Sequence, residues 1–374
     1  MIISKDISDI AKVCADCGNC LYACPVYNAE FTEPNSPRGK VNIIKGIIDG
    51  ELSNTSLSRK FIYQCVLCGS CEDVCTKGVD YVDMMINYRT VISKGKKIPL
   101  LKKIILSLYQ SFLYKKLLFF IDIISKTYLK KIFLIPRRRK LNLKKYYTSD
   151  KKKTYDILFF PGCVLTDFYP EIIEKTINLL KKNGFTVLLP KGLSCCGFPY
   201  ISQGWKDKFD KYQGKNMKIL NGYKFKSIVI PCGTGTITFK KYYDIDKEIS
   251  VYELTDFIYK FINDATLDKT LIKDRKITYH DPCHNIKSLH IEKQPRYFLS
   301  QAGENFIDDK SKLCCGFGGV FSIGFPSTSN KILKRKSDTI KQTGADTVIT
   351  SCPGCYMQLR ENLPLDVKFF TDIF

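Results

Sequence analysis

Hydrophobic residues in the second half of the chain gather in short runs, with longer amphipathic stretches between them. Runs of three or four apolar residues predict strands, and Glu171–Lys182 repeats its apolar positions at helical spacing. The predicted strands are Ile157–Phe160, Val187–Leu189, Ser227–Ile230, Ile277–Tyr279, Thr347–Ile349 and Val367–Phe370. Strands that alternate with helices predict parallel sheets with helices packed on them.

The first ninety residues show helical periodicity instead. The clearest stripe at helical spacing is formed by Val41, Ile43, Ile44, Ile47 and Ile48. We therefore expect a helical domain over residues 1–95 and α/β structure from residue 154 to the end.

A basic segment, residues 96–153, separates these two parts. From Lys94 to Lys153 there are 19 Lys or Arg against two Asp, so most of the net charge of +22 lies here. Apolar residues at spacings of three and four predict amphipathic helices with lysines on their flanks, namely Leu101, Ile104, Ile105, Leu108 and Phe112, continued by Leu113, Leu117, Phe120 and Ile124.

The apolar stretches of this segment are too interrupted to span a membrane, since no run reaches 18 residues. Two interpretations stay open. The helices lie in the headgroup layer of an anionic membrane, with the cluster Arg137–Lys140 contributing to attachment. Alternatively, they pack between the two halves of the protein and leave their lysines in water.

Cysteine is unusually frequent, with 17 residues, and all of them fall inside short repeated motifs. Disulfides need an oxidising compartment, and the N-terminal residues show no signal-peptide core. An odd number of cysteines also fits a fully paired framework badly. We expect a cytoplasmic protein whose thiols bind metal.

Two of these motifs lie in the first ninety residues and share the spacing C-x2-C-x2-C-x3-C. The first motif is Cys14, Cys17, Cys20 and Cys24, and the second is Cys65, Cys68, Cys71 and Cys75. Three thiolates two residues apart bind one 4Fe–4S cluster from a tight loop, and the fourth points away along the start of a helix to the other cluster.

This geometry predicts which cysteines share a cluster. We expect one 4Fe–4S cluster on Cys14, Cys17, Cys20 and Cys75, and another on Cys65, Cys68, Cys71 and Cys24. A pair of zinc knuckles is the alternative, but zinc sites use two C-x2–4-C pairs, not runs of four. The domain resembles an α-helical ferredoxin.

The second half of the chain is an internal duplication with a period of about 120 residues. We place the first repeat at residues 154–265 and the second at 266–374. Cys163 matches Cys283, the pair Cys195–Cys196 matches Cys314–Cys315, and Cys232 matches Cys352. Thr255-Asp256 and Thr371-Asp372 also match. Ligands of parallel sheets lie beyond the carboxyl ends of the strands, so the cysteines are expected along one edge.

The two repeats differ in the number of thiols. The second repeat has five, namely Cys283, Cys314, Cys315, Cys352 and Cys355. In the first repeat Gly235 stands where the second has Cys355, which leaves Cys163, Cys195, Cys196 and Cys232. Neighbouring cysteines strain a simple tetrahedral site but can hold two irons of a larger cluster.

The three histidines of the chain all lie in the second repeat. His280 and His284 flank Cys283, where they could hydrogen-bond to cluster sulfur, tune its potential or move a proton. Alternatively, they only cap the end of the strand, which is the interpretation we favour for His290.

The motifs Tyr279–His284 and Cys314–Gly319 resemble the cysteine-rich CCG domains of heterodisulfide reductase. The domain order is similar to that of the iron–sulfur subunits of three enzymes: glycolate oxidase, anaerobic glycerol-3-phosphate dehydrogenase and heterodisulfide reductase. Ser36-Pro37-Arg38-Gly39 is similar to an SPRG motif of the glycolate oxidase branch.

This resemblance implies an α-helical ferredoxin domain followed by two tandem α/β CCG repeats. It also implies that the five cysteines of the second repeat hold a non-cubane 4Fe–4S cluster. The four-cysteine site of the first repeat is incomplete by that comparison, and zinc, an altered cluster or an empty site are the alternatives.

Two functions follow from the resemblance. The first is an electron relay from an FAD-containing dehydrogenase, acting on a 2-hydroxy acid or glycerol 3-phosphate, through two 4Fe–4S clusters to the CCG half and a quinone or other acceptor. The second is reduction of a disulfide at the CCG cluster, with a cytochrome b as the neighbouring protein. The absent fifth cysteine and the SPRG motif favour the relay.

Binding to nucleic acid is not expected, because no fold for it is recognisable. The chain also has no flavin or Rossmann motif, so hydride chemistry belongs to a partner.

Overall fold

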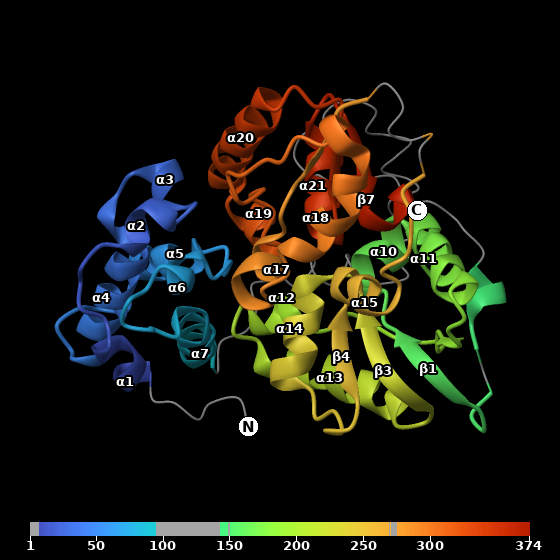
Figure 1. Ribbon diagram of the computed structural model, residues 1–374. Coiled ribbons are helices and arrows are strands. Elements are labelled where there is room, and N and C mark those ends of the chain that lie inside the picture. The colour runs from blue at the N-terminus through green and yellow to red at the C-terminus, as the bar shows by residue number, and fades with distance from the viewer. Residues whose placement is uncertain (1–6, 95–142, 149, 269, 271–274) are drawn as a thin grey trace, which may run out of the picture.

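The computed structural model describes residues 7–94, 143–148, 150–268, 270 and 275–374 (Figure 1). Helices from the N-terminal part lie on one side of the molecule, and the two sheet-containing repeats lie beside them, one above the other in this view. The predicted amphipathic helices of residues 101–124 and the cluster Arg137–Lys140 lie outside the described residues. Within the part described, no helix is both long enough and apolar enough to cross a bilayer.

The N-terminal part, residues 7–94, is helical, as its periodicity predicts. Its elements are α1 (Ile7–Lys12), α2 (Cys20–Ala23), α3 (Tyr27–Glu30), η1 (Glu33–Asn35), α4 (Pro37–Ile48), α5 (Ser56–Tyr63), α6 (Ser70–Asp73) and α7 (Tyr81–Ser93). Ser36 caps α4 by accepting a hydrogen bond from the Gly39 amide, and Pro37 begins the helix. The predicted stripe on α4 is confirmed at Val41 and Ile44, which are buried, whereas Ile48 is 43% exposed.

One detail of the cysteine motifs differs from expectation. The fourth cysteine does not start a helix. In the first motif α2 begins at Cys20 and Cys24 follows its last residue, and in the second α6 ends two residues before Cys75. A single helical turn therefore lies between the third and fourth cysteines and carries the fourth away from the loop.

The first repeat contains a parallel sheet of four strands in the order β2-β1-β3-β4. The strands are β1 (Thr154–Phe159), β2 (Val187–Leu188), β3 (Lys224–Ile230) and β4 (Ser250–Glu253). Its helical elements are η3 (Leu143–Tyr146), α10 (Gly162–Phe168), α11 (Pro170–Lys182), α12 (Phe198–Ile201), α13 (Lys206–Leu220), α14 (Gly233–Tyr242) and α15 (Leu254–Phe261).

The second repeat has the same topology with one strand reduced. Parallel strands β5 (Ile277–Tyr279), β6 (Thr347–Thr350) and β7 (Asp366–Phe369) pair in this order. A single parallel bridge between Ile277 and Phe306 takes the place of β2. The helical elements are α17 (Cys283–Ser288), α18 (Lys293–Leu299), η4 (Ser300–Asn305), α19 (Val320–Gly324), α20 (Pro326–Gln342), α21 (Pro353–Asn362) and η5 (Phe370–Ile373).

The six predicted strands are thus confirmed, as is the helix predicted over Glu171–Lys182. The sequence missed β4, which is a short edge strand with only Glu253 fully buried.

The two repeats pack on each other reciprocally. Helix α11 of the first repeat contacts η5 of the second, where Lys175 pairs with Asp372 at 2.5 Å. In the matching place, α18 of the second repeat contacts α15 of the first, where Gln294 donates to Asp256 at 3.1 Å. One hydrophobic core includes residues of both repeats. This arrangement turns the carboxyl ends of both sheets toward a common region.

The N-terminal helices are fastened to the first repeat by α7. The fully buried Arg89 donates to the carbonyls of Ile62 and Cys65 in its own domain and to that of Ser202 in the first repeat. A Cβ atom on Gly204 would lie 2.2 Å from the Arg89 carbonyl oxygen, so only glycine permits this approach. The second hydrophobic core likewise combines residues of both parts.

Candidate metal centres

The eight cysteines of the N-terminal part gather at two cavities, and each cavity draws on both sequence motifs. One, the exposed site, is lined by Cys14, Cys17 and Cys20 of the first motif and by Cys75 of the second. Arg38 also lines it, donating to the Asp16 carbonyl at 3.0 Å and pairing with Glu33 at 2.7 Å. Cys17 is exposed to solvent.

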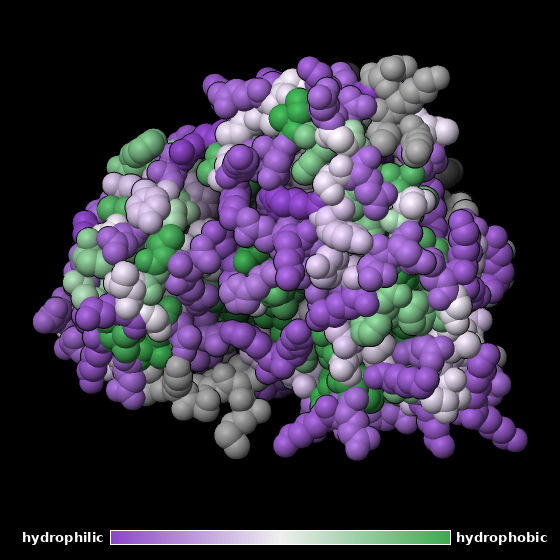
Figure 2. Space-filling view, in the orientation of Figure 1, coloured by the Kyte–Doolittle hydropathy of each residue, from purple (hydrophilic) through white to green (hydrophobic). Residues whose placement is uncertain are grey.

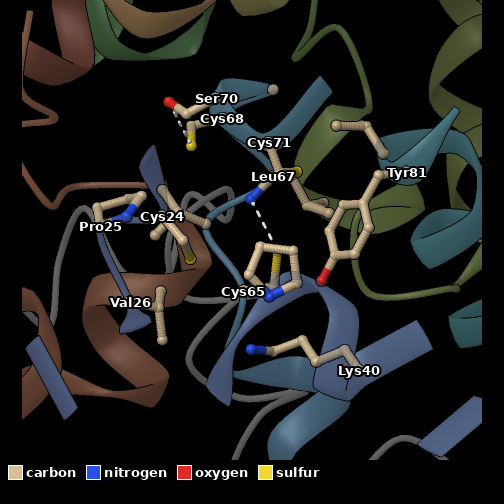
Figure 3. Close-up of a pocket in the computed structure, with 14 residues that line it drawn as sticks. Cys24, Pro25, Val26, Lys40, Cys65, Leu67, Cys68, Ser70, Cys71 and Tyr81 are labelled. Atoms are coloured by element: carbon tan, nitrogen blue, oxygen red, sulfur yellow. Dashed lines mark hydrogen bonds between the residues drawn. The ribbon is translucent and has the colours of Figure 1, made fainter. Parts of the chain in front are cut away.

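The other cavity, the buried site, is lined by Cys65, Cys68 and Cys71 of the second motif and by Cys24 of the first. Figure 3 shows the four sulfur atoms around one space, with the Lys40 side chain reaching toward it from α4. The sulfurs accept hydrogen bonds from the chain: the Leu67 amide donates to Cys65 Sγ and the Tyr27 amide to Cys24 Sγ, each at 3.4 Å.

Two buried cations mark the buried site as a place for an anion. Lys40 and Arg89 are each 1% exposed, and no carboxylate of the described residues pairs with either. Their hydrogen bonds go to backbone carbonyls, including that of Asn35 for Lys40. Burial lowers the pKa of the Lys40 ammonium, and thiolates at Cys24, Cys65 and Cys71 would oppose that effect. A buried cation without a counter-charge is costly, so four thiolates around an iron–sulfur core fit this environment.

The thiols of this site need a metal in order to ionise. Burial raises the pKa of the Cys24 thiol to about 11. Burial also raises the pKa values of Cys68 and Cys71, and neighbouring thiolates add to the effect. A coordinated metal deprotonates such thiols outright. The donor set therefore suits 4Fe–4S ligation, which is all thiolate.

In the second repeat, the five predicted cysteines lie together at the ends of the strands. Cys283 begins α17 after β5, Cys352 lies between β6 and α21, and Cys355 lies in the first turn of α21. Cys315 and Cys355 have their sulfurs 3.4 Å apart, and Cys283 contacts Cys314 through its side chain. Cys314, Cys315 and Cys355 are buried. We call these five residues the second CCG site, after the resemblance noted above.

In the first repeat, four cysteines form a smaller group, the first CCG site. The side chain of Cys195 contacts both Cys163 and Cys196. Cys232 caps α14, its sulfur accepting a hydrogen bond from the Gly235 amide at 3.4 Å. The donating amide belongs to Gly235, the residue that matches Cys355, whereas the side chain of Cys352 in the second repeat accepts no capping hydrogen bond.

The two groups are not separate, which the sequence did not reveal. The side chains of Cys232 and Cys352 lie close enough to interact across the boundary between the repeats. The nine cysteines of the repeats thus form one continuous cluster of thiols. The only hint in the sequence is that these two cysteines occupy matching positions, since residues at matching positions meet at a twofold axis when repeats pack reciprocally.

The cysteine-rich CCG domain matches this chain twice, at residues 157–240 and 277–360. The 4Fe-4S dicluster domain matches residues 10–79. The chain belongs to the CCG-domain iron–sulfur proteins.

Three relatives of this CCG protein are named as oxidoreductase subunits. A component of the fumarate reductase (CoM/CoB) from Methanothermobacter marburgensis is 27% identical over 96% of this chain and 70% of its own. The probable glycolate oxidase iron–sulfur subunit of Bacillus subtilis is 26% identical over 93% of this chain and 88% of its own. The glycolate oxidase iron–sulfur subunit of Escherichia coli is 21% identical over 98% and 94%. The CCG protein is accordingly an oxidoreductase subunit that acts in electron transfer.

Among solved structures, a hypothetical protein from Helicobacter pylori matches 84% of this chain and 63% of its own length. The identity is 12% and the TM-score 0.49, too low a likeness to support any inference.

The histidines of the CCG protein have three different surroundings. His284 joins three parts of the molecule: its Nε2 lies 2.8 Å from the Leu67 carbonyl in the second cysteine motif, and its Nδ1 lies 2.6 Å from the Thr234 hydroxyl in the first repeat. Because a carbonyl only accepts, Nε2 carries the proton and Thr234 donates to Nδ1. Burial lowers the pKa of His284, which keeps it neutral. His290 is exposed, and His280 is fully buried.

Proposed function

We propose that this protein relays electrons from an FAD-containing dehydrogenase through two 4Fe–4S clusters to its CCG half. The exposed site (Cys14, Cys17, Cys20, Cys75) and the buried site (Cys65, Cys68, Cys71, Cys24) each hold one 4Fe–4S cluster. The second CCG site (Cys283, Cys314, Cys315, Cys352, Cys355) holds a third, non-cubane cluster. For the first CCG site (Cys163, Cys195, Cys196, Cys232), zinc, an altered cluster and an empty site are the alternatives.

The observation that carries this proposal is the contact between the buried site and the second CCG site. Cys68 and Cys314 belong to one small buried cluster, with Cys24 and Cys283 packed at its edge. Burial raises the pKa of Cys68, and the charge of Cys314 raises it further. Bound iron–sulfur clusters take up and release single electrons. Proposed ligands of two centres that lie in one packed cluster would give electrons a short path through the protein.

The exposed site is the natural entry point for electrons from a partner. Seven of the nine large hydrophobic side chains that are exposed in the described residues belong to the N-terminal part: Val13, Tyr22, Phe31, Ile48, Leu52, Leu57 and Val91. In Figure 2 apolar patches interrupt the polar surface over these helices. Exposed apolar surface beside a redox site favours docking of another protein.

We propose that electrons leave from the CCG half to a quinone or another carrier at the inner face of the cytoplasmic membrane. The support is the basic segment, since each Lys or Arg near an anionic surface contributes about 1 kcal/mol. Binding to anionic vesicles should be lost at high salt and weakened when Arg137–Lys140 is neutralised. A protein that ignores such vesicles at low salt, with its partner present, would rule out this attachment.

A second function is supported by the meeting of Cys232 and Cys352. Thiolate ligands from both repeats at one point suit reduction of a disulfide, and one relative is named for CoM and CoB. The reaction would consume two electrons and two protons per disulfide and yield two thiols. Reduced viologen supplies the electrons in a test. Two equivalents of viologen oxidised per disulfide would favour this function, and no oxidation would favour the simple relay.

Metal analysis and magnetic spectroscopy test the relay. Protein prepared without oxygen should hold about 12 irons, four per 4Fe–4S cluster, and zinc near one equivalent would identify the occupant of the first CCG site. The Cys68–Cys314 contact predicts spin coupling between the reduced centres of the buried and second CCG sites. Cys314→Ser should abolish that coupling and leave the two N-terminal signals. Saturation at eight irons would refute a cluster in the second repeat.

A further inference from the structure

His280 is fully buried at the end of β5, and both of its ring nitrogens have no hydrogen-bond partner among the described residues. Its backbone is fixed: its amide donates to the Ile349 carbonyl at 2.8 Å, and its own carbonyl accepts from Thr350 Oγ1 at 3.1 Å. A buried imidazole with two unsatisfied nitrogens is costly, so something outside the polypeptide is expected to satisfy it.

The nearby charged residues do not meet this need. The charges that act on His280 are those of Lys336 and Asp309. These two form a fully buried ion pair with each other, 2.5 Å apart, and Asp309 also accepts from the Ser311 amide at 3.0 Å. Neither group is within hydrogen-bonding distance of the imidazole, because both ring nitrogens are without partners.

What does lie close to the imidazole is a pair of cysteines. A nitrogen of His280 and the sulfurs of Cys315 and Cys355 all lie within 4.8 Å of one another. All three residues are buried. Imidazole and thiolate are both ligands for iron and zinc, and three such atoms around one point form one face of a tetrahedral metal site.

The first repeat lacks two of these three donors at once. At the period of about 120 residues, Phe160 matches His280 and Gly235 matches Cys355. The space is filled with hydrocarbon there: the Phe160 ring lies 4.7 Å from that of Phe239, and a Cβ atom on Gly235 would lie 3.0 Å from Ile230 Cγ2. The histidine and the fifth cysteine therefore occur together in one repeat and are absent together from the other.

We propose that His280 is a metal ligand of the second CCG site and binds the metal atom that Cys315 and Cys355 also bind. The second repeat then offers six donors, five thiolates and one imidazole, whereas the first offers four thiolates. This inference rests on the proposed function only for the presence of a metal in the second repeat. On this proposal, Cys355 and His280 together supply the two donors that the first repeat lacks, and their presence determines which repeat binds the larger metal centre.

Isotope labelling tests the ligation directly, because the chain has only three histidines. Protein grown with ¹⁵N-histidine and reduced without oxygen should show strong nitrogen hyperfine coupling at the second CCG centre. His280→Phe should abolish this coupling and lower the metal content of that site, while His284→Gln and His290→Phe retain it. A weak coupling, as from a hydrogen bond to sulfur, or a strong one that survives in His280→Phe would overturn the ligation.

Two further variants control for misfolding and distinguish the proposed His280 ligation from the proposed electron relay. His280→Cys should keep the metal, since a thiolate replaces the imidazole, but lose the nitrogen coupling. The pair His280→Phe and Cys355→Gly, which copies the first repeat, should give the second site the metal content of the first. Full metal and an unchanged spectrum in His280→Phe refute the inference alone, whereas an iron-free second site in the unmodified protein refutes the relay.

Discussion

The exposed site and the buried site have the same four ligands at the same spacing, but their surroundings differ. The exposed site has solvent at Cys17, and its cation, Arg38, is neutralised by Glu33. The buried site has Lys40 and Arg89, which are both inaccessible to solvent and lack a carboxylate partner among the described residues. Arg38 and Lys40 lie two residues apart at the start of α4, and one lines each cavity.

If both sites hold 4Fe–4S clusters as proposed, this difference predicts a direction of electron flow. Reduction adds a negative charge, which a buried cation stabilises far more than a solvated and paired one. The buried cluster is therefore expected to have the higher reduction potential, so that electrons entering at the surface move inward. Arg38 and Lys40 are therefore predicted to give the two proposed clusters different reduction potentials.

The largest effect is expected from exchanging the crossed ligands. Cys24→Ser should destroy the cluster of the buried site and leave that of the exposed site, although Cys24 belongs to the first motif. Cys75→Ser should do the reverse. Iron analysis and electron paramagnetic resonance of the two variants distinguish the centres. If each variant lost the cluster of its own motif, the crossed assignment would be wrong.

The two sites should lose their metal at different rates. Under mild oxidation with a chelator, the exposed site should lose iron first, by a factor on the order of ten, because Cys17 is open to water while Cys68 is buried. The loss of each signal over time is the measurement. Equal rates would show that burial does not protect the second cluster.

Lys40→Met tests the electrostatic difference itself. Removal of a buried charge should make reduction of the buried cluster less favourable by about 2 kcal/mol, which lowers its potential by roughly 90 mV for one electron. The exposed cluster should shift little. A redox titration followed by electron paramagnetic resonance gives both potentials. An unchanged potential for the buried cluster would contradict the proposed role of Lys40.

The smallest effect is expected from the matched change at the exposed site. Arg38→Met should lower the potential of that cluster by only about 0.5 kcal/mol, or roughly 20 mV, because water screens the charge and Glu33 already pairs with it. The shift should shrink further at high salt. A shift as large as that in Lys40→Met would mean that solvent does not distinguish the two sites.

Much of the fold could be predicted because its helices and strands follow from hydrophobic patterns over short stretches of sequence. Short apolar runs and helical repeats located six strands and the helix α4, and the cysteine spacing located every thiol that lines the cavities. The edge strand β4 was not predicted because Ser250 is exposed, its one buried residue is Glu253, and the strand shows no apolar run.

The contacts between domains could not be predicted in the same way. The pairs Cys68–Cys314, Cys232–Cys352 and His284–Leu67 join residues far apart in sequence, and they depend on how preformed parts pack. Lys40 is the one residue whose position in the sequence could have indicated a buried anionic site. It lies four residues before Ile44, on the buried face of α4. A lysine on the apolar stripe of a helix needs a negative partner inside the protein.

The position of the buried site also constrains how the protein is made. Cys24 and Cys68 pack against residues of the second repeat, which is synthesised after them, and α20 contacts α3 through the ion pair of Lys331 with Glu30. If the buried site holds the proposed 4Fe–4S cluster, we expect the cluster to be delivered before that repeat docks on the N-terminal helices. A cell short of iron would then accumulate an open chain, vulnerable to proteolysis, in place of an intact apoprotein.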